Sequence, residues 1–156
     1  SGQVPRQEPR FDVQEISAGS QVATGSCRVT AGRAIHLQPM MECLTYRVDW
    51  DGGSVLITGD TGRHRTIEEL AKNVSTLVVN VWDHQENMSA AMTSGFCGTL
   101  DAAELATAAG LDSLVVTHQS TNLIRPGSKE KAIADMAAVY KGRIIFGEEL
   151  MALDLN

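Results

Sequence analysis

The sequence predicts an α/β layered fold built on a mixed sheet with about three helices. In its first third, short extended segments follow one another, and Cys43 to Trp50 alternates apolar with polar residues, as a half-buried strand does. From about residue 54 onward, apolar strands alternate with amphipathic helical segments. A run of strands followed by strand and helix alternation indicates a sheet covered by helices. The 156 residues, 43% hydrophobic and 21% charged, suit one globular domain or a large part of one.

The first third is predicted to form antiparallel strands. Residues 1–10 contain two prolines and little apolar content, which indicates an irregular lead-in, so the predicted domain spans residues 11–156. Short strands are expected at Phe11 to Ile16 and at Cys27 to Ile35, with a turn near Gly19 between them. Residues 51–53, Asp-Gly-Gly, are typical of a hairpin and would join Cys43 to Trp50 with a strand at Ser54 to Thr58.

Three helices are predicted from caps and apolar periodicity. Thr66 and Glu69 form a capping-box pattern that would begin a helix ending at Asn73. Thr99 would cap a second helix that runs through Ala109. Ser128 would cap the third helix, and its buried stripe is expected to consist of Ile133, Met136, Ala137 and Tyr140.

Buried strands are expected between and after these helices. The apolar runs that predict them are Thr76 to Trp82, Leu114 to Thr117, Arg143 to Phe146 and Met151 to Leu155. A strand that is apolar on both faces is typical of the interior of a sheet.

Charge and cysteine content narrow the class of function. A net charge of −6 makes nucleic-acid binding through general electrostatics unexpected. The three cysteines are scattered, without a Cys-x-x-Cys pair, which favours a reducing, cytoplasmic location. No apolar run reaches the eighteen or so residues that span a bilayer, so no membrane partner is expected.

Three polar residues follow predicted strands and are candidates for a metal site. His36 follows Cys27 to Ile35, Asp60 follows the strand that ends at Thr58, and His118 follows the strand that ends at Thr117. Strand ends on one edge of a sheet converge. Two imidazoles and a carboxylate suit a borderline divalent ion such as zinc, whereas isolated histidines that bond backbone carbonyls are the alternative.

These residues also resemble a family. His36, the Leu44-Thr45-Tyr46-Arg47-Val48 strand, Ile57-Thr58-Gly59-Asp60-Thr61 and Leu114-Val115-Val116-Thr117-His118 follow one another in an order similar to the C-terminal half of a metallo-β-lactamase-fold hydrolase. The subgroup most resembled contains ribonuclease Z and arylsulfatase-like phosphodiesterases. The resemblance implies the αβ/βα sandwich of that fold, and it covers nearly the whole chain from Phe11.

The resemblance also implies roles for the three candidates. His36 would be a ligand of one metal, His118 a ligand of the other, and Asp60 the catalytic carboxylate that bridges them. The cofactor would be two zinc ions, with manganese or iron as alternatives. A metal-bound hydroxide would attack an ester, lactone or phosphodiester bond of a small-molecule substrate.

Two departures from the family pattern leave alternatives open. The His-x-His-x-Asp-His motif is absent, so the N-terminal half of the domain is expected as a partner segment; otherwise, the chain is a non-catalytic binding or scaffold domain without metals. Asn80 stands where ribonuclease Z-like enzymes have an assisting histidine, and the 51–53 hairpin leaves no room for an RNA-gripping arm. The ribonuclease Z-like activity is therefore the alternative to a general hydrolase, nucleic acid is not the expected partner, and a homodimer is left open.

Three further polar residues are candidates for substrate binding. Asp83 and His84 follow the Thr76 to Trp82 strand, and Asn122 follows His118 by four positions. Loops at strand ends often line a substrate pocket. A polar loop that caps its neighbours is the competing interpretation.

Overall fold

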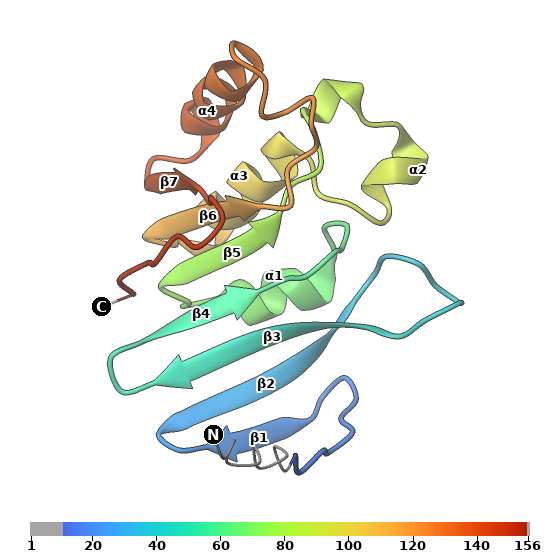
Figure 1. Cartoon of the computed structure of the whole chain (residues 1–156), viewed down its shortest axis with the longest axis vertical. Helices are drawn as coiled ribbons and strands as arrows, with labels where there is room; N and C mark the ends of the chain where they lie inside the picture. The colour runs from blue at the N-terminus through green and yellow to red at the C-terminus, as the bar shows by residue number, and fades with distance from the viewer. Residues whose placement is uncertain (1–10, 156) are drawn as a thin grey trace, which may run out of the picture.

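The computed structural model describes residues 11–155 and contains one mixed sheet of seven strands (Figure 1). Each strand pairs with its neighbour in the sequence, so the sheet order is β1 to β7. The strands are β1 (Gln21–Thr24), β2 (Cys27–Ala34), β3 (Cys43–Trp50), β4 (Gly53–Ile57), β5 (Thr76–Asn80), β6 (Ser113–Thr117) and β7 (Arg143–Phe146). The α/β fold class with a mixed sheet is thereby confirmed.

Pairing changes from antiparallel to parallel at β4. Strands β1 to β4 pair antiparallel, and strands β4 to β7 pair parallel. Parallel neighbours need crossover connections, which the helices supply. The helices are α1 (Arg65–Ala71), α2 (Ala90–Thr93), α3 (Thr99–Ala109) and α4 (Ser128–Val139), with a single 3₁₀ turn, η1, at Gln85–Asn87.

One face of the sheet carries the hydrophobic core. Leu56 of β4, Leu77 of β5 and Leu114 of β6 are fully buried and share this face with Val79 and Val116. They form one cluster with buried residues of α1, α3 and α4. The core thus holds the three parallel strands in place, and with them the loops at their carboxyl ends.

The opposite face of the sheet has no helix on it among the described residues (Figure 1). It contains two cross-strand rows, which are Val29, Val48, Val55, Thr76, Ser113 and Arg143, and Ala31, Tyr46, Ile57, Val78, Val115 and Ile145. The C-terminal segment 152–155 lies over its β5–β7 part, where Val115 is 2% exposed. On β4, Ile57 remains 43% exposed. We call this surface the helix-free face.

Two predicted strands are absent. Phe11 to Ile16 and Met151 to Leu155 are irregular, and the strand at the sheet edge is β1, which the prediction missed. Phe11 is 80% exposed and Met151 is 43% exposed, so neither segment packs its apolar side chains as a paired strand does. An extended conformation becomes a strand only when a neighbouring edge accepts its hydrogen bonds.

The predicted helix caps are each displaced by one or two residues. Thr66, Thr99 and Ser128 lie inside the first turns of α1, α3 and α4, and the N-cap residues are His64, Gly98 and Gly127. A Thr or Ser is an N-cap only if its backbone is extended, and here the helical backbone begins before or at these residues.

The buried stripe of α4 also differs from the prediction. Met136 and Tyr140 are buried as expected, whereas Ile133 is 39% exposed and Ala137 is exposed. Ala132 is fully buried in their place. Residues four apart, 132, 136 and 140, therefore face the core, so the buried stripe includes position 132 in place of 133 and 137.

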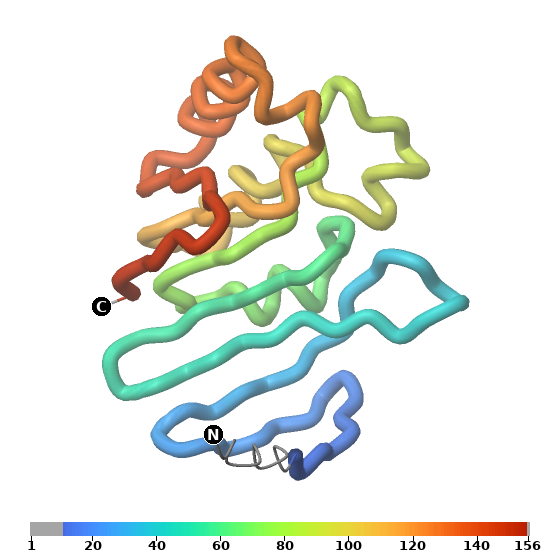
Figure 2. The backbone as a smooth tube through the Cα atoms, in the orientation of Figure 1, coloured from blue at the N-terminus to red at the C-terminus, as the bar shows by residue number. Residues whose placement is uncertain are grey.

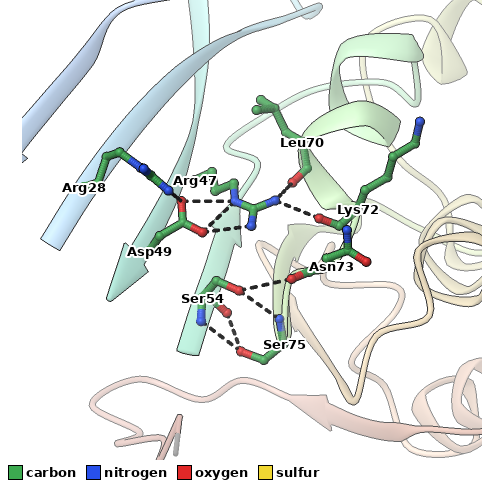
Figure 3. Close-up of polar contacts among 8 residues, drawn as sticks. All are labelled: Arg28, Arg47, Asp49, Ser54, Leu70, Lys72, Asn73 and Ser75. Atoms are coloured by element: carbon green, nitrogen blue, oxygen red, sulfur yellow. Dashed lines mark hydrogen bonds and ion pairs between the residues drawn. The ribbon is translucent and has the colours of Figure 1, made fainter. Parts of the chain in front are cut away.

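A polar cluster ties the antiparallel strands to α1 (Figure 3). The Arg47 guanidinium donates to the backbone oxygens of Leu70 (3.0 Å) and Lys72 (2.7 Å) and also binds both carboxylate oxygens of Asp49. In the same region, Ser54 and Ser75 exchange hydrogen bonds between β4 and the start of β5. Charged donors thus satisfy the carbonyls at the C-terminal end of α1.

Several loops gather at the carboxyl ends of β4 to β6. In Figure 2, the β2–β3 loop, the β4–α1 loop and the segment around α2 all lie on that side of the molecule. No helix among residues 11–155 is long and apolar enough to cross a membrane.

Candidate metal centre

The structure brings His36, Asp60 and His118 together at the carboxyl ends of β4 and β6. His36 lies in the loop after β2, Asp60 in the loop after β4, and His118 directly after β6. The Nε2 atom of His36 is 3.8 Å from Oδ2 of Asp60, and the Nε2 atom of His118 is 3.8 Å from Oδ1. The two imidazoles therefore face different oxygens of one carboxylate, and strand-end reasoning predicted this meeting.

His36 is held in one orientation by a backbone carbonyl. Its Nδ1 lies 2.9 Å from the backbone oxygen of Gly95, which can only accept, so Nδ1 carries the proton. In the neutral ring, Nε2 then has its lone pair facing Asp60. This pattern, with one nitrogen bonded to a carbonyl and the other free, is the one that metal-binding histidines adopt.

His118 combines exposure with an unusual backbone conformation. Its side chain is 47% exposed, and its φ is +54°, in the left-handed region that few non-glycine residues occupy. The turn directs the chain out of β6 as soon as the strand ends. Its ring lies 5.9 Å from the Trp82 ring.

Aromatic contacts connect the two histidines. The Phe96 ring lies edge-on to His36, with ring centroids 4.6 Å apart, and Trp82 lies 5.4 Å from Phe96. Since Trp82 also contacts His118, the four rings form a continuous series from one histidine to the other. Edge-to-face and tilted arrangements are the favoured ones for such rings.

Asn80, at the end of β5, contacts Asp60. Its Nδ2 donates to Oδ1 of Asp60, and its Oδ1 accepts from the Thr117 hydroxyl at 2.8 Å. Thr117 immediately precedes His118, so one amide joins the end of β6 to the carboxylate. The sequence offered Asn80 only as a departure from a family pattern, and this contact was not predicted.

The separations at the site suit divalent ions. At 3.8 Å, the imidazole nitrogens lie beyond hydrogen-bonding distance of the carboxylate. Two ligand atoms that each lie about 2 Å from one ion can be up to about 4 Å apart. Nitrogen and oxygen ligands facing one another across such a gap fit zinc, manganese or iron.

The predicted substrate-binding residues form a separate hydrogen-bonded group. Oδ1 of Asp83 accepts from the His84 backbone at 2.7 Å and from the side chains of Asn87 and Asn122. Burial alone would raise the pKa of Asp83, but together these hydrogen bonds outweigh it, so the pKa is lowered from its usual value. The three predicted residues thus join the loops after β5 and β6, and their substrate role remains a prediction.

A second group of possible ligands consists of His84, Glu86 and Asp135. His84 is 4% exposed, and its Nε2 lies 2.9 Å from the Ser128 hydroxyl. The Lys131 ammonium already contacts both carboxylates, at 2.8 Å for Glu86. Lys131 therefore already supplies a positive charge to both carboxylates of this group.

No protein-family model matches the chain. A solved structure, the metallo-β-lactamase fold protein YhfI from Bacillus subtilis, superposes on 85% of the chain with a TM-score of 0.73 at 18% identity. The chain has the metallo-β-lactamase fold, of which it forms a C-terminal region. This confirms the expected fold and family resemblance, while an identity this low shows the fold alone.

The curated relatives of the chain include ribonuclease Z proteins. The ribonuclease Z of Mycobacterium tuberculosis (strain ATCC 25177 / H37Ra) is 27% identical over 154 residues, which cover 95% of the chain and 56% of that protein. The chain thus spans little more than half of this relative, and 52% of YhfI. These comparisons support a hydrolase and specify no substrate.

One neighbour with this fold is a metalloenzyme. CmlA, a diiron β-hydroxylase from Streptomyces venezuelae, superposes on 87% of the chain and 33% of its own length, with a TM-score of 0.61 at 12% identity. The same fold therefore accommodates iron in that protein.

Proposed function

We propose that the chain forms part of a metal-dependent hydrolase in which His36, Asp60 and His118 hold two divalent ions, with zinc as the first candidate. One observation carries the proposal: His36 and His118 face different oxygens of Asp60, each at 3.8 Å. A carboxylate approached in this way has one oxygen for each of two ions. When bound, such ions lower the pKa of water and polarise the bond to be cleaved.

The protein's own residues prepare this site. Gly95 fixes the His36 tautomer, and the ring series through Phe96 and Trp82 limits rotation of both histidines. The Asp60 side chain is 33% exposed, which leaves it accessible to ions and substrate. The Trp82 and Phe96 rings keep water from part of the site, since aromatic surface offers no strong hydrogen-bond partner.

We further propose that an N-terminal half of the same domain completes the ligand set and covers the helix-free face. The chain spans only 56% of its ribonuclease Z relative, and three ligands are too few for two ions. The helix-free face presents Tyr46, Ile57 and Val78 in one cross-strand row and Val48 in the neighbouring row, and a second layer would bury these apolar side chains. Cytoplasmic location and a homodimer stay predictions.

The second candidate is a phosphodiesterase of the ribonuclease Z kind. The curated relative favours it. Two features argue against transfer-RNA processing. Asn80 cannot act as the acid or base that a histidine could, and the hairpin between β3 and β4 consists only of residues 51 and 52, which leaves no room for an RNA-gripping arm. The net charge of −6 also disfavours a large RNA. A small phosphodiester or ester is therefore the substrate class that we propose.

Metal analysis of the natural full-length protein tests the proposal. We expect about two ions per complete domain after metal-replete purification. Asp60→Ala should abolish metal retention and the hydrolysis of bis(p-nitrophenyl) phosphate or p-nitrophenyl acetate. Asp51→Ala, in the exposed hairpin at the other end of the strands, is the matched control and should change neither. Absence of metal in the unsubstituted protein would favour a binding or scaffold domain, and full metal content in Asp60→Ala would refute the bridging role.

A further inference from the structure

The Asn80 side chain is placed so that its two ends have different partners. Its carbonyl oxygen accepts from the Thr117 hydroxyl at 2.8 Å, and its amide nitrogen donates to Oδ1 of Asp60. The Asp60 carboxylate can only accept, so its contact requires the amide nitrogen of Asn80 on that side, and the amide oxygen then faces the Thr117 hydroxyl. Asp60 therefore determines which end of the amide faces it, and the Thr117 hydroxyl holds the other end in place.

The backbone around Asn80 is itself fixed by the sheet. Asn80 pairs with Thr117 in the parallel β5–β6 ladder, and its backbone nitrogen donates to the Thr58 hydroxyl at 3.4 Å. Thr58 is fully buried and lies two residues before Asp60. Asn80 is therefore anchored on both sides, through its backbone to Thr58 directly after β4 and through its side chain to Thr117 of β6.

We propose that Asn80 is a positioning residue that sets the rotamer of Asp60, and that Thr117 acts on Asp60 only through Asn80. This rests on the proposed function, because the rotamer matters for metal binding only if Asp60 is a ligand. The hydrogen bond from Asn80 uses one lone pair of Oδ1, the Asp60 oxygen that faces His118. The other oxygen, Oδ2, is thereby directed toward His36. Asn80 itself touches neither His36 nor His118 through any hydrogen bond described for residues 11–155.

Zinc affinity of the full-length protein, measured by competition with a chelating dye, tests this relay. Asn80→Ala should weaken zinc binding by about 10- to 100-fold, the range for outer-shell partners of metal ligands. Thr117→Val, which removes one hydroxyl and keeps the shape, should weaken it by about 2- to 10-fold, the equivalent of one neutral hydrogen bond. Thr117→Ser keeps the hydroxyl and should restore the affinity.

The decisive measurement is the double variant. If Thr117 acts through Asn80, Thr117→Val should have no further effect once Asn80 is alanine, whereas independent structural effects would add. Thr107→Val in α3, the same substitution at an exposed position, is the control for general destabilisation. Thermal unfolding of each variant checks that it folds. If Asn80→Ala does not fold, the zinc affinities of Thr117→Val and Thr117→Ser still test the inference.

Three results would overturn the inference. They are wild-type affinity in folded Asn80→Ala, equal effects of Thr117→Val in both backgrounds, and failure of Thr117→Ser to restore binding. Failure of the proposed function has a different signature, because the unsubstituted protein would then bind no zinc. Loss of zinc in Asp60→Ala together with unchanged binding in Asn80→Ala would overturn the positioning role alone.

Discussion

Arg47→Ala should destabilise the fold through the C-terminal end of α1. In the structure, one guanidinium nitrogen donates to the backbone oxygens of Leu70 and Lys72, while the remaining nitrogens bind Asp49 (Figure 3). Removal of Arg47 leaves the Asp49 carboxylate, 20% exposed, without its close cation. It also leaves the last carbonyls of α1 without a donor.

The magnitude follows from how exposed each partner is. A hydrogen bond from a charged donor contributes about 1.5–3 kcal/mol, and the partly buried one to Leu70 is assigned the lower limit, about 1.5 kcal/mol. The bond to Lys72 is exposed, so water replaces it at little cost. The Asp49 pair, with both side chains about one fifth exposed, adds roughly 0.5 kcal/mol. The expected loss is about 2 kcal/mol.

Urea unfolding of the full-length protein measures this loss, and Arg28 supplies the control. Arg28 also faces Asp49, but at 3.9 Å and with its side chain 64% exposed, so Arg28→Ala should cost less than about 0.5 kcal/mol. The loss of unfolding free energy in Arg47→Lys should lie between those of Arg47→Ala and Arg28→Ala, since an ammonium cannot reproduce the forked contacts. Equal free energies of unfolding for Arg47→Ala and Arg28→Ala would refute the assignment of stability to the helix-end contacts.

Three further predictions concern two buried residues, Cys97 and Gly62. Burial raises the pKa of the Cys97 thiol from 9.0 to about 12, so a thiol reagent should modify the half-buried Cys27 and Cys43 in the native protein and Cys97 only after unfolding. Because the unfolded chain loses this proton first, stability should fall as the pH rises from about 9 toward 12, and Cys97→Ala should show a smaller fall; identical slopes would contradict this. Gly62→Ala should loosen the loop beside Asp60, since a Cβ there would lie 2.6 Å from the backbone oxygen of Ser94, and faster hydrogen exchange around α2 would reveal it; unchanged exchange would count against it.

The fold was predictable where the local pattern and the tertiary contacts agree. Cys43 to Trp50 alternates without interruption, and its bounds in the structure are those predicted. Phe11 to Ile16 has similar local preferences but no neighbouring strand edge, and pairing is a property of two segments. Helix starts were missed by a residue or two because Gly98 and Gly127 act as N-caps through backbone conformation, which composition does not reveal.

The candidate site was likewise predictable only in part from the sequence. His36, Asp60 and His118 were predictable because parallel strand ends converge, which requires only the order of elements. Asn80 and the Trp82–Phe96 pair were not predictable as parts of the site, because their contacts join residues that are 20 to 60 positions apart. A strand-end polar residue such as Asn80, on a strand between those of Asp60 and His118, was the available signal.

The left-handed backbone of His118 links stability to function in opposite directions. A non-glycine residue in this region carries a cost of about 1–3 kcal/mol, and glycine at the same position would relieve it. Selection for stability alone would favour glycine directly after β6. Glycine there would also remove the imidazole that faces Asp60 at 3.8 Å, so stability and the proposed metal site make opposite demands on this position.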